Sequence, residues 1–159
     1  MKRILKILGA LLLLFVVLQI LRTYYPNGHI PNYSYLGLDG KYHSKKELPS
    51  TPIIFVYFSP DCGFCEKAIP ELQSLRKRYA NINYVFVTNQ KINKIVVDFI
   101  NKNNLSELTS FILIDKNDKF PVDFGLGIVY STPTFLVYDK TGFLLKKFTN
   151  YGDIKSLKI

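Results

Sequence analysis

The sequence is poor in the side chains that bind soft metal ions, since its 159 residues include only two cysteines and two histidines. The cysteines are Cys62 and Cys65, and both histidines, His29 and His43, lie far upstream of them. A structural zinc site needs four such ligands at close spacing, so two cysteines with no nearby histidine fall short. We therefore predict no metal site and no bound cofactor.

Acidic residues are absent from the first 22 positions, where four of the basic residues lie. The formal net charge is +9, but beyond residue 22 the lysines are scattered and form no arginine-rich face. This pattern indicates a mildly basic, solvated surface and argues against nucleic-acid binding. The sequence has no low-complexity tract or internal repeat, and its length fits one domain with a short extra element.

The N-terminal stretch is apolar from Ile7 to Leu21, with few interruptions. A helix of about 18 residues spans about 27 Å, close to the thickness of the hydrocarbon core of a bilayer. Gln19–Arg22 lacks the small residues of a cleavage site, and no cysteine near the start offers itself for lipidation. We therefore predict an uncleaved signal-anchor and single transmembrane helix over residues 1–22.

More basic residues precede this span than follow it, so the positive-inside rule places the N-terminus in the cytoplasm. A linker over 23–32 and a single domain over 33–159 would follow. The sequence thus predicts a single-pass protein of the cytoplasmic membrane. Its C-terminal domain would lie on the periplasmic or extracytoplasmic side.

The central motif is a strand that leads into a Cys-x-x-Cys turn and then a helix. Residues 53–58 form an unbroken apolar run, typical of a buried strand. The following residues, 61–79, carry apolar side chains at helical spacing. Cys62-Gly63-Phe64-Cys65 lies between the two patterns. Two structural cysteines or half of a zinc site are the alternatives, but this position favours a redox dithiol.

The helix start gives the two cysteines different chemistry. Its partial positive charge and unpaired N–H groups should stabilise a thiolate on Cys62 and lower the pKa of that thiol. Cys65, one turn further along, could then close a redox-active disulfide with Cys62.

The rest of the sequence predicts an α/β fold with a mixed sheet, because strands and helices alternate and a hairpin follows. Pro70 inside the first domain helix should kink that helix. The predicted elements are a hairpin over 33–43, a strand over 83–87, a helix over 91–103, a strand over 111–114, an irregular segment over 115–131, strands over 132–138 and 143–148, and a short helix over 153–158.

Four features together resemble the thioredoxin superfamily: the Cys-x-x-Cys motif, Pro70 after it, Thr132-Pro133 before a strand, and the turn 139–142. The leading hairpin, the extra segment 105–130 and the predicted anchor are similar to its TlpA/ResA branch of membrane-tethered thiol–disulfide oxidoreductases. The resemblance implies a thioredoxin-like fold, with a central mixed sheet flanked by helices.

The resemblance also implies the site. Cys62 and Cys65 would be catalytic, and Gly63, Phe64, Thr132 and Pro133 would support the site and bind substrate. Pro133 would follow a cis peptide bond beside the dithiol, and the backbone of Thr132 would offer strand-like hydrogen bonds to an extended substrate.

Two positions depart from the family pattern. Many thioredoxins carry a buried acid six residues before the first cysteine, where this chain has Val56. ResA-type members carry a glutamate three residues after the second cysteine, where this chain has Ala68. The sequence therefore does not identify the group that deprotonates Cys65.

The leading functional hypothesis is reduction of disulfides in exported proteins, with apocytochromes as a candidate substrate and a membrane electron-transfer partner that restores the dithiol. The reverse flow, as a disulfide oxidase or isomerase, stays open because the residues between the cysteines tune the potential. A copper-delivery protein is a third hypothesis. Such proteins have three residues between their cysteines and a histidine further on, and this chain has neither.

Overall fold

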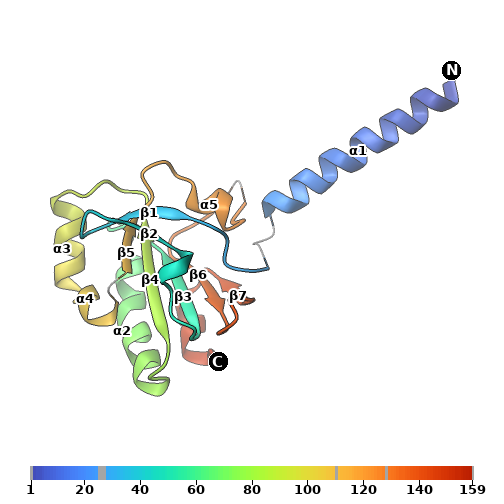
Figure 1. Cartoon of the computed structure of the whole chain (residues 1–159). Coiled ribbons are helices and arrows are strands. Elements are labelled where there is room, and N and C mark those ends of the chain that lie inside the picture. Colours follow the sequence, from blue (N-terminus) through green and yellow to red (C-terminus); the bar gives the residue numbers. More distant parts are fainter. Residues whose placement is uncertain (1, 25–27, 110, 128, 159) are drawn as a thin grey trace.

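The computed structural model describes residues 2–24, 28–109, 111–127 and 129–158. Its centre is a seven-stranded sheet in the order β2-β1-β5-β4-β3-β6-β7 (Figure 1). β3, β4 and β5 are parallel neighbours, and the other pairings are antiparallel, so the sheet is mixed. The strands are β1 (Ser34–Gly37), β2 (Tyr42–Ser44), β3 (Ile53–Tyr57), β4 (Asn83–Thr88), β5 (Phe111–Ile114), β6 (Thr134–Tyr138) and β7 (Leu144–Phe148).

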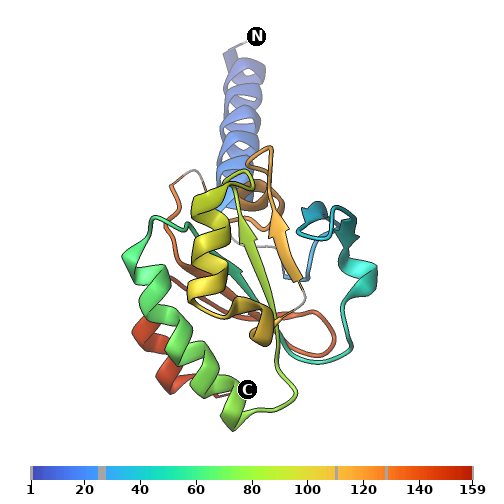
Figure 2. The ribbon, with the colours of Figure 1, turned by 90° about the vertical axis from the view of Figure 1, so that its left-hand side faces the viewer.

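Short helical elements surround the sheet on both faces. Successive side chains of β3 alternate between two hydrophobic clusters, as the pleat of a strand requires. One cluster includes residues of α2, α3, α4 and η2, and the other includes residues of α5. Figure 2 shows α2 (green) and α3 (yellow) in front of the sheet. These elements are η1 (Lys45–Glu47), α2 (Gly63–Arg78), α3 (Lys94–Lys102), α4 (Leu105–Leu108), α5 (Phe120–Asp123) and η2 (Tyr151–Ser156).

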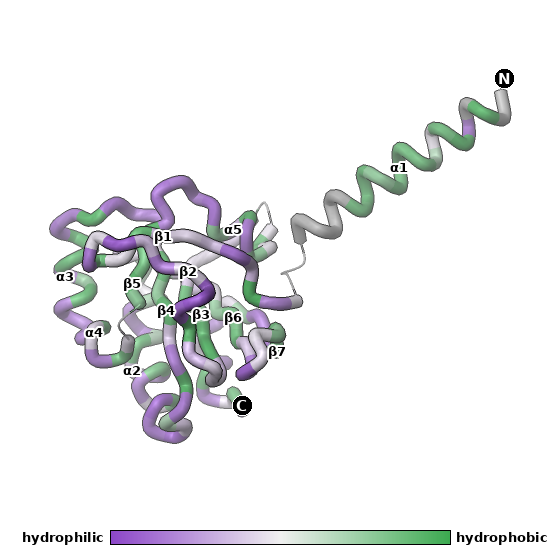
Figure 3. Tube along the Cα trace, in the orientation of Figure 1, coloured by the Kyte–Doolittle hydropathy of each residue, from purple (hydrophilic) through white to green (hydrophobic). Residues whose placement is uncertain are grey.

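Hydrophobic burial explains why the central strands lie where they do. Every residue of β3 and β6 is buried, and β3 over residues 53–56 and β6 over residues 135–137 are hydrophobic. Figure 3 shows the green of hydrophobic residues in β3 and β6. Strands buried on both faces need near-continuous apolar runs, and these two segments supply them. The central position of β3 matters for function because the chain leaves β3 directly toward the two cysteines.

The N-terminal helix α1 runs from Lys2 to Tyr24 (Figure 1). The side chains from Lys6 to Leu18 are all exposed. Within the described residues, no helix is both long enough and apolar enough to cross a membrane. The predicted transmembrane helix is therefore not confirmed.

Part of the predicted linker packs against the domain. Ile30 is only 4% exposed, and its N–H donates to the carbonyl of Gly142 at 2.9 Å. The N–H of Leu144 donates in turn to the carbonyl of Gly28 at 2.9 Å. Residues 28–30 therefore belong with the domain, while residues 25–27 of that linker lie outside the described residues.

The segment predicted to be irregular contains the short helix α5. The buried carboxylate of Asp115 starts this helix by accepting the N–H groups of Lys119 and Phe120, at 2.9 and 2.7 Å. An acceptor at a helix start satisfies N–H groups that have no partner inside the helix. A four-residue helix is too short to show helical periodicity, so α5 could not be predicted from a hydrophobic pattern.

Candidate active site

The site is built at the junction between β3 and α2. After β3, the N–H of Phe58 still donates to the carbonyl of Val87 at 2.9 Å, so the chain stays aligned with β4 for one more residue. A turn closed by the Cys62 N–H on the Ser59 carbonyl, at 3.1 Å, then reverses it. Cys62 is the N-cap of α2, and its carbonyl accepts the N–H of Cys65 at 2.9 Å. Cys62 therefore lies where the helix N–H groups point.

The two thiols differ in exposure and in acidity. Cys62 is half-buried, whereas Cys65 is only 2% exposed and packs in the cluster between the sheet and α2. Burial alone would raise the pKa of Cys62. Hydrogen bonds from the Cys65 thiol and from the N–H groups of Cys65 and Phe64 outweigh burial, so this pKa is lowered. Burial raises the pKa of Cys65 to about 12, and the hydrogen bond to Cys62 adds to that effect.

The segment before β6 meets the dithiol. The peptide bond between Thr132 and Pro133 is cis, and Pro133 is buried. In its thiol form, Cys62 donates its S–H to the carbonyl of Thr132 at 3.2 Å. Residues 70 positions apart in the sequence thus form one site. The structure brings together Cys62, Cys65 and the Thr132–Pro133 segment.

Gly63 and Phe64 lie on the outer surface of this site. A Cβ on Gly63 would meet no atom within 4 Å, so close packing does not require glycine there. Phe64 is 61% exposed and stacks on Tyr151 of η2, with ring centroids 6.2 Å apart. The Lys67 ammonium lies 5.6 Å from the centre of the Phe64 ring. An exposed aromatic ring therefore lies two residues after Cys62 on the surface of the molecule.

No carboxylate in the described residues takes the place of the missing family acids. Val56 and Ala68 are both buried in the same cluster as Cys65. Asp115 is the only buried carboxylate among the described residues, and it caps α5. Asp61 is exposed and accepts the side-chain N–H of Gln90 at 2.7 Å.

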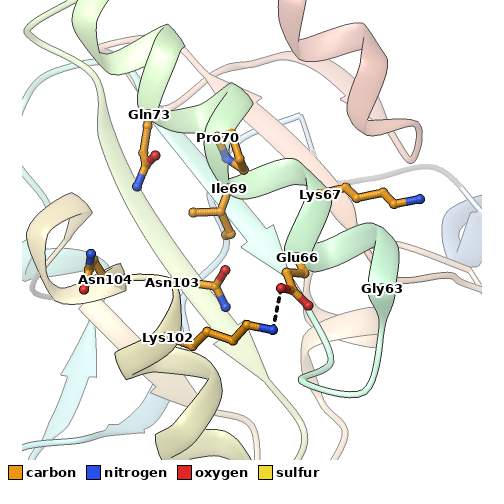
Figure 4. Close-up of a pocket in the computed structure, with 9 residues that line it drawn as sticks. All are labelled: Gly63, Glu66, Lys67, Ile69, Pro70, Gln73, Lys102, Asn103 and Asn104. Carbon is orange, nitrogen blue, oxygen red and sulfur yellow. Dashed lines mark ion pairs between the residues drawn. The ribbon is translucent and has the colours of Figure 1, made fainter.

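Glu66, the other acid beside the motif, forms an ion pair with Lys102 across the gap between α2 and α3, at 2.7 Å (Figure 4). This pair lies in an open groove of about 600 Å³ that runs from Gly63 along α2 to Asn104. Neither cysteine lines the groove. Glu66 therefore forms an exposed link between α2 and α3 at the side of the helix away from the buried cluster.

Two contacts at the site have no signal in the sequence. Gln90 donates from Nε2 to Ser59 Oγ at 3.1 Å as well as to Asp61, so it ties down the turn that leads to Cys62. Tyr151 supports Phe64 from the C-terminal end of the chain. Gln90 could have been suspected only from the sheet order, because the ends of the parallel neighbours β3 and β4 meet at one edge.

A sheet of this topology, whose central strand leads into a Cys-x-x-Cys turn at a helix start, defines a disulfide oxidoreductase of the thioredoxin superfamily. The Redoxin family model matches residues 26–157, and the chain belongs to the Redoxin family. The predicted thioredoxin-like α/β fold with a mixed central sheet is confirmed.

Solved structures of bacterial proteins share the fold. The thioredoxin domain of a thiol-disulfide oxidoreductase from Bacteroides vulgatus matches with a TM-score of 0.67 at 14% identity, over 82% of this chain and 93% of that chain. A thiol:disulfide interchange protein of the thioredoxin family from Chlorobium tepidum TLS matches with a TM-score of 0.64 at 18% identity, over 82% of this chain and 92% of that chain.

A secreted disulfide oxidoreductase from Mycobacterium tuberculosis, homologous to E. coli DsbE, matches with a TM-score of 0.59 at 18% identity, over 79% and 96%. At these identities the likeness concerns the fold. A search of curated proteins found no match.

Proposed function

We propose that this protein reduces disulfides of exported proteins through Cys62 and Cys65. The observation that carries thiol–disulfide exchange at these two cysteines, in either direction, is the unequal pair of thiols: Cys62 is accessible and its pKa is lowered, whereas Cys65 is buried and its pKa is raised. A nucleophile that must meet a large partner needs exposure and thiolate character. The thiol that resolves the complex needs only to reach Cys62.

The reaction then has two exchanges. The Cys62 thiolate attacks one sulfur of the partner disulfide, that disulfide breaks, and the leaving sulfur takes up a proton. Cys65 loses its proton and attacks the Cys62 sulfur, which releases the partner with two thiols and leaves a Cys62–Cys65 disulfide. Two electrons pass from the dithiol to the partner. An exported enzyme needs a membrane electron-transfer partner to restore its dithiol.

Electrons could pass in either direction between this dithiol and a partner disulfide. Reduction follows from the resemblance to the TlpA/ResA branch. The lowered pKa of Cys62 favours the reverse flow, as an oxidase or isomerase, because a stabilised thiolate makes the disulfide more oxidising. Copper delivery gains no support, since no group of three His, Cys, Asp or Glu side chains in the described residues could hold a metal ion.

Trapping thiols in intact cells decides the direction. Cells are quenched in acid and treated with a maleimide that adds mass to each free thiol, and the protein is resolved by gel. We expect a mainly reduced Cys62–Cys65 pair. The purified Cys65→Ala variant, reduced before labelling and carrying a single thiol, calibrates the shift for one modification. A mainly oxidised pair would reverse the assignment to an oxidase or isomerase.

We also propose that residues 1–22 tether the protein to the cytoplasmic membrane, with the domain on the extracytoplasmic side. The apolar run and the preceding positive charges support this, as does the exposure of the apolar side chains from Ile7 to Leu18 in α1. The protein should stay in the membrane fraction after alkaline washing, and mass spectrometry of the purified protein should detect residues 1–22. An N-terminus near residue 22 would contradict the tether.

A further inference from the structure

A single carboxylate oxygen joins three segments next to the redox site. Asp118 Oδ1 accepts the hydroxyl of Tyr57 at 3.2 Å, the side-chain N–H of Asn89 at 3.1 Å and the hydroxyl of Tyr130 at 3.3 Å. Tyr57 ends β3, Asn89 follows β4, and Tyr130 belongs to the loop before Thr132. Asp118 itself follows β5, so it lies at the edge where the three parallel strands end.

The backbone at Asp118 is shaped to present this side chain. Its φ is 55°, in the left-handed region that aspartate and asparagine adopt more readily than most residues. The N–H of Asp118 donates to the carbonyl of Asp115 at 3.4 Å, and the carboxylate of Asp115 caps α5. The turn that carries Asp118 is thereby anchored to the buried part of the segment 115–123.

Aromatic ring contacts connect the segment around Asp118 with the loop before Thr132. The ring of Tyr57 stacks on Phe120, with centroids 4.9 Å apart and planes at 5°. Tyr130 meets the Tyr57 ring edge to face, with centroids 5.7 Å apart. Tyr130 is therefore held by a ring contact and by its hydrogen bond to Asp118. It lies two residues before Thr132, whose carbonyl is 3.2 Å from the Cys62 sulfur.

We propose that Asp118 is a positioning residue for the redox site. Through its hydrogen bond with Tyr130, Asp118 fixes the position of the segment 131–133 relative to Cys62. A partner disulfide would dock on the backbone of this segment. The proposal rests on the proposed function, since it concerns the docking of the disulfide partner. It predicts that loss of the Asp118–Tyr130 hydrogen bond weakens partner binding and leaves the reactivity of Cys62 nearly unchanged.

The test uses the reduced full-length protein and two disulfide probes in single-turnover mixing experiments. One probe is a short peptide with one internal disulfide, which needs docking. The other is the small aromatic disulfide 5,5′-dithiobis(2-nitrobenzoate), which reacts with an accessible thiolate without it. For Tyr130→Phe we expect the half-saturating peptide concentration to rise about fivefold, since one net hydrogen bond is lost. The limiting rate and the reaction with the small probe should change less than about twofold.

The chain offers a matched control in the same segment. Tyr35 donates its hydroxyl to Asp123 at 2.8 Å, so Tyr35→Phe also removes a tyrosine–aspartate hydrogen bond, one that is more buried and leads to β1 and not to the loop before Thr132. Tyr35→Phe should leave the half-saturating peptide concentration and the rate of reaction with the small probe unchanged. Asp118→Asn keeps an acceptor oxygen and tolerates the left-handed backbone. Its half-saturating peptide concentration should therefore lie between those of the wild-type protein and Asp118→Ala.

The outcomes separate the two proposals. An unchanged half-saturating concentration in Tyr130→Phe and Asp118→Ala would overturn the positioning role alone. An equal rise in Tyr35→Phe would show a general loss of order and overturn it as well. If the wild-type protein reacts with the small probe but not with the peptide, the proposed function fails, and the positioning role fails with it.

Discussion

Replacing Cys65 with alanine is expected to stop the reaction at the mixed disulfide. Cys62 keeps its place at the start of α2, so its attack on a partner should proceed, but no second thiol remains to release the product. Turnover of a peptide disulfide should fall by roughly a thousandfold or more, as when a nucleophilic group is removed from an enzyme. Covalent complexes with partner proteins should accumulate in cells.

The Cys62→Ala variant is the matched control for this trap. It should lose turnover to a similar degree and form almost no covalent complexes, because Cys65 is only 2% exposed and burial raises the pKa of its thiol. Non-reducing gels after acid quenching compare the two variants, and mass spectrometry identifies the captured partners. Capture by Cys62→Ala instead would invert the roles of the cysteines. Capture by neither variant would contradict the reductase proposal.

The fold could be predicted from the sequence where hydrophobic patterns are long. The apolar run at 53–58 and the helical spacing after it located β3 and α2, and the strand at 111–114 was placed correctly. Short elements could not be predicted from the sequence, because they form through single contacts with distant or neighbouring residues. The four-residue helix α5 is set by the carboxylate of Asp115, and a hydrophobic period cannot appear in so few residues.

The residues of the site likewise fall into two groups, those that a local sequence motif predicts and those that only the fold brings to the site. The spacing of Cys62 and Cys65 and the motif Thr132-Pro133 are local signals, and the structure places these residues together. Gln90, Tyr151 and Asp118 act at the site only because the sheet order and the chain ends bring them there. Each is an ordinary polar or aromatic residue in its local sequence. Contacts of this kind depend on the order of the strands in the sheet. A sequence pattern within one segment carries no information about that order.

Among the described residues, the only buried carboxylate, Asp115, caps α5, and the lack of a buried acid beside Cys65 has a kinetic consequence that depends on pH. Burial raises the pKa of the Cys65 thiol well above its ordinary value, so only a very small fraction of the molecules carries the Cys65 thiolate at pH 7. That fraction grows tenfold for each pH unit until the pKa is reached. Attack by Cys65 on the mixed disulfide should therefore speed up about tenfold per unit between pH 6 and pH 9.

Val56→Asp should relieve this dependence. Val56 is 2% exposed, lies in the same buried cluster as Cys65, and stands where many thioredoxins carry a buried acid. Aspartate has nearly the size of valine, so it would place a proton acceptor in the cluster with little change in volume. Since general bases contribute about 10²- to 10⁴-fold, the resolving step at pH 7 should become at least about a hundredfold faster. Its dependence on pH should flatten.

The measurement follows the second release of the coloured thiolate after reduced protein is mixed with 5,5′-dithiobis(2-nitrobenzoate), since that phase reports attack by Cys65 on the Cys62 adduct. Val56→Asn is the control, because it buries a polar group of the same shape without a base. Both variants should lose stability, by about 1–3 kcal/mol for a buried polar group without a full set of partners. If the second phase of the wild-type protein is already independent of pH between 6 and 9, another group accepts the proton of Cys65. If Val56→Asp and Val56→Asn behave alike, position 56 does not serve as the proton acceptor in this fold.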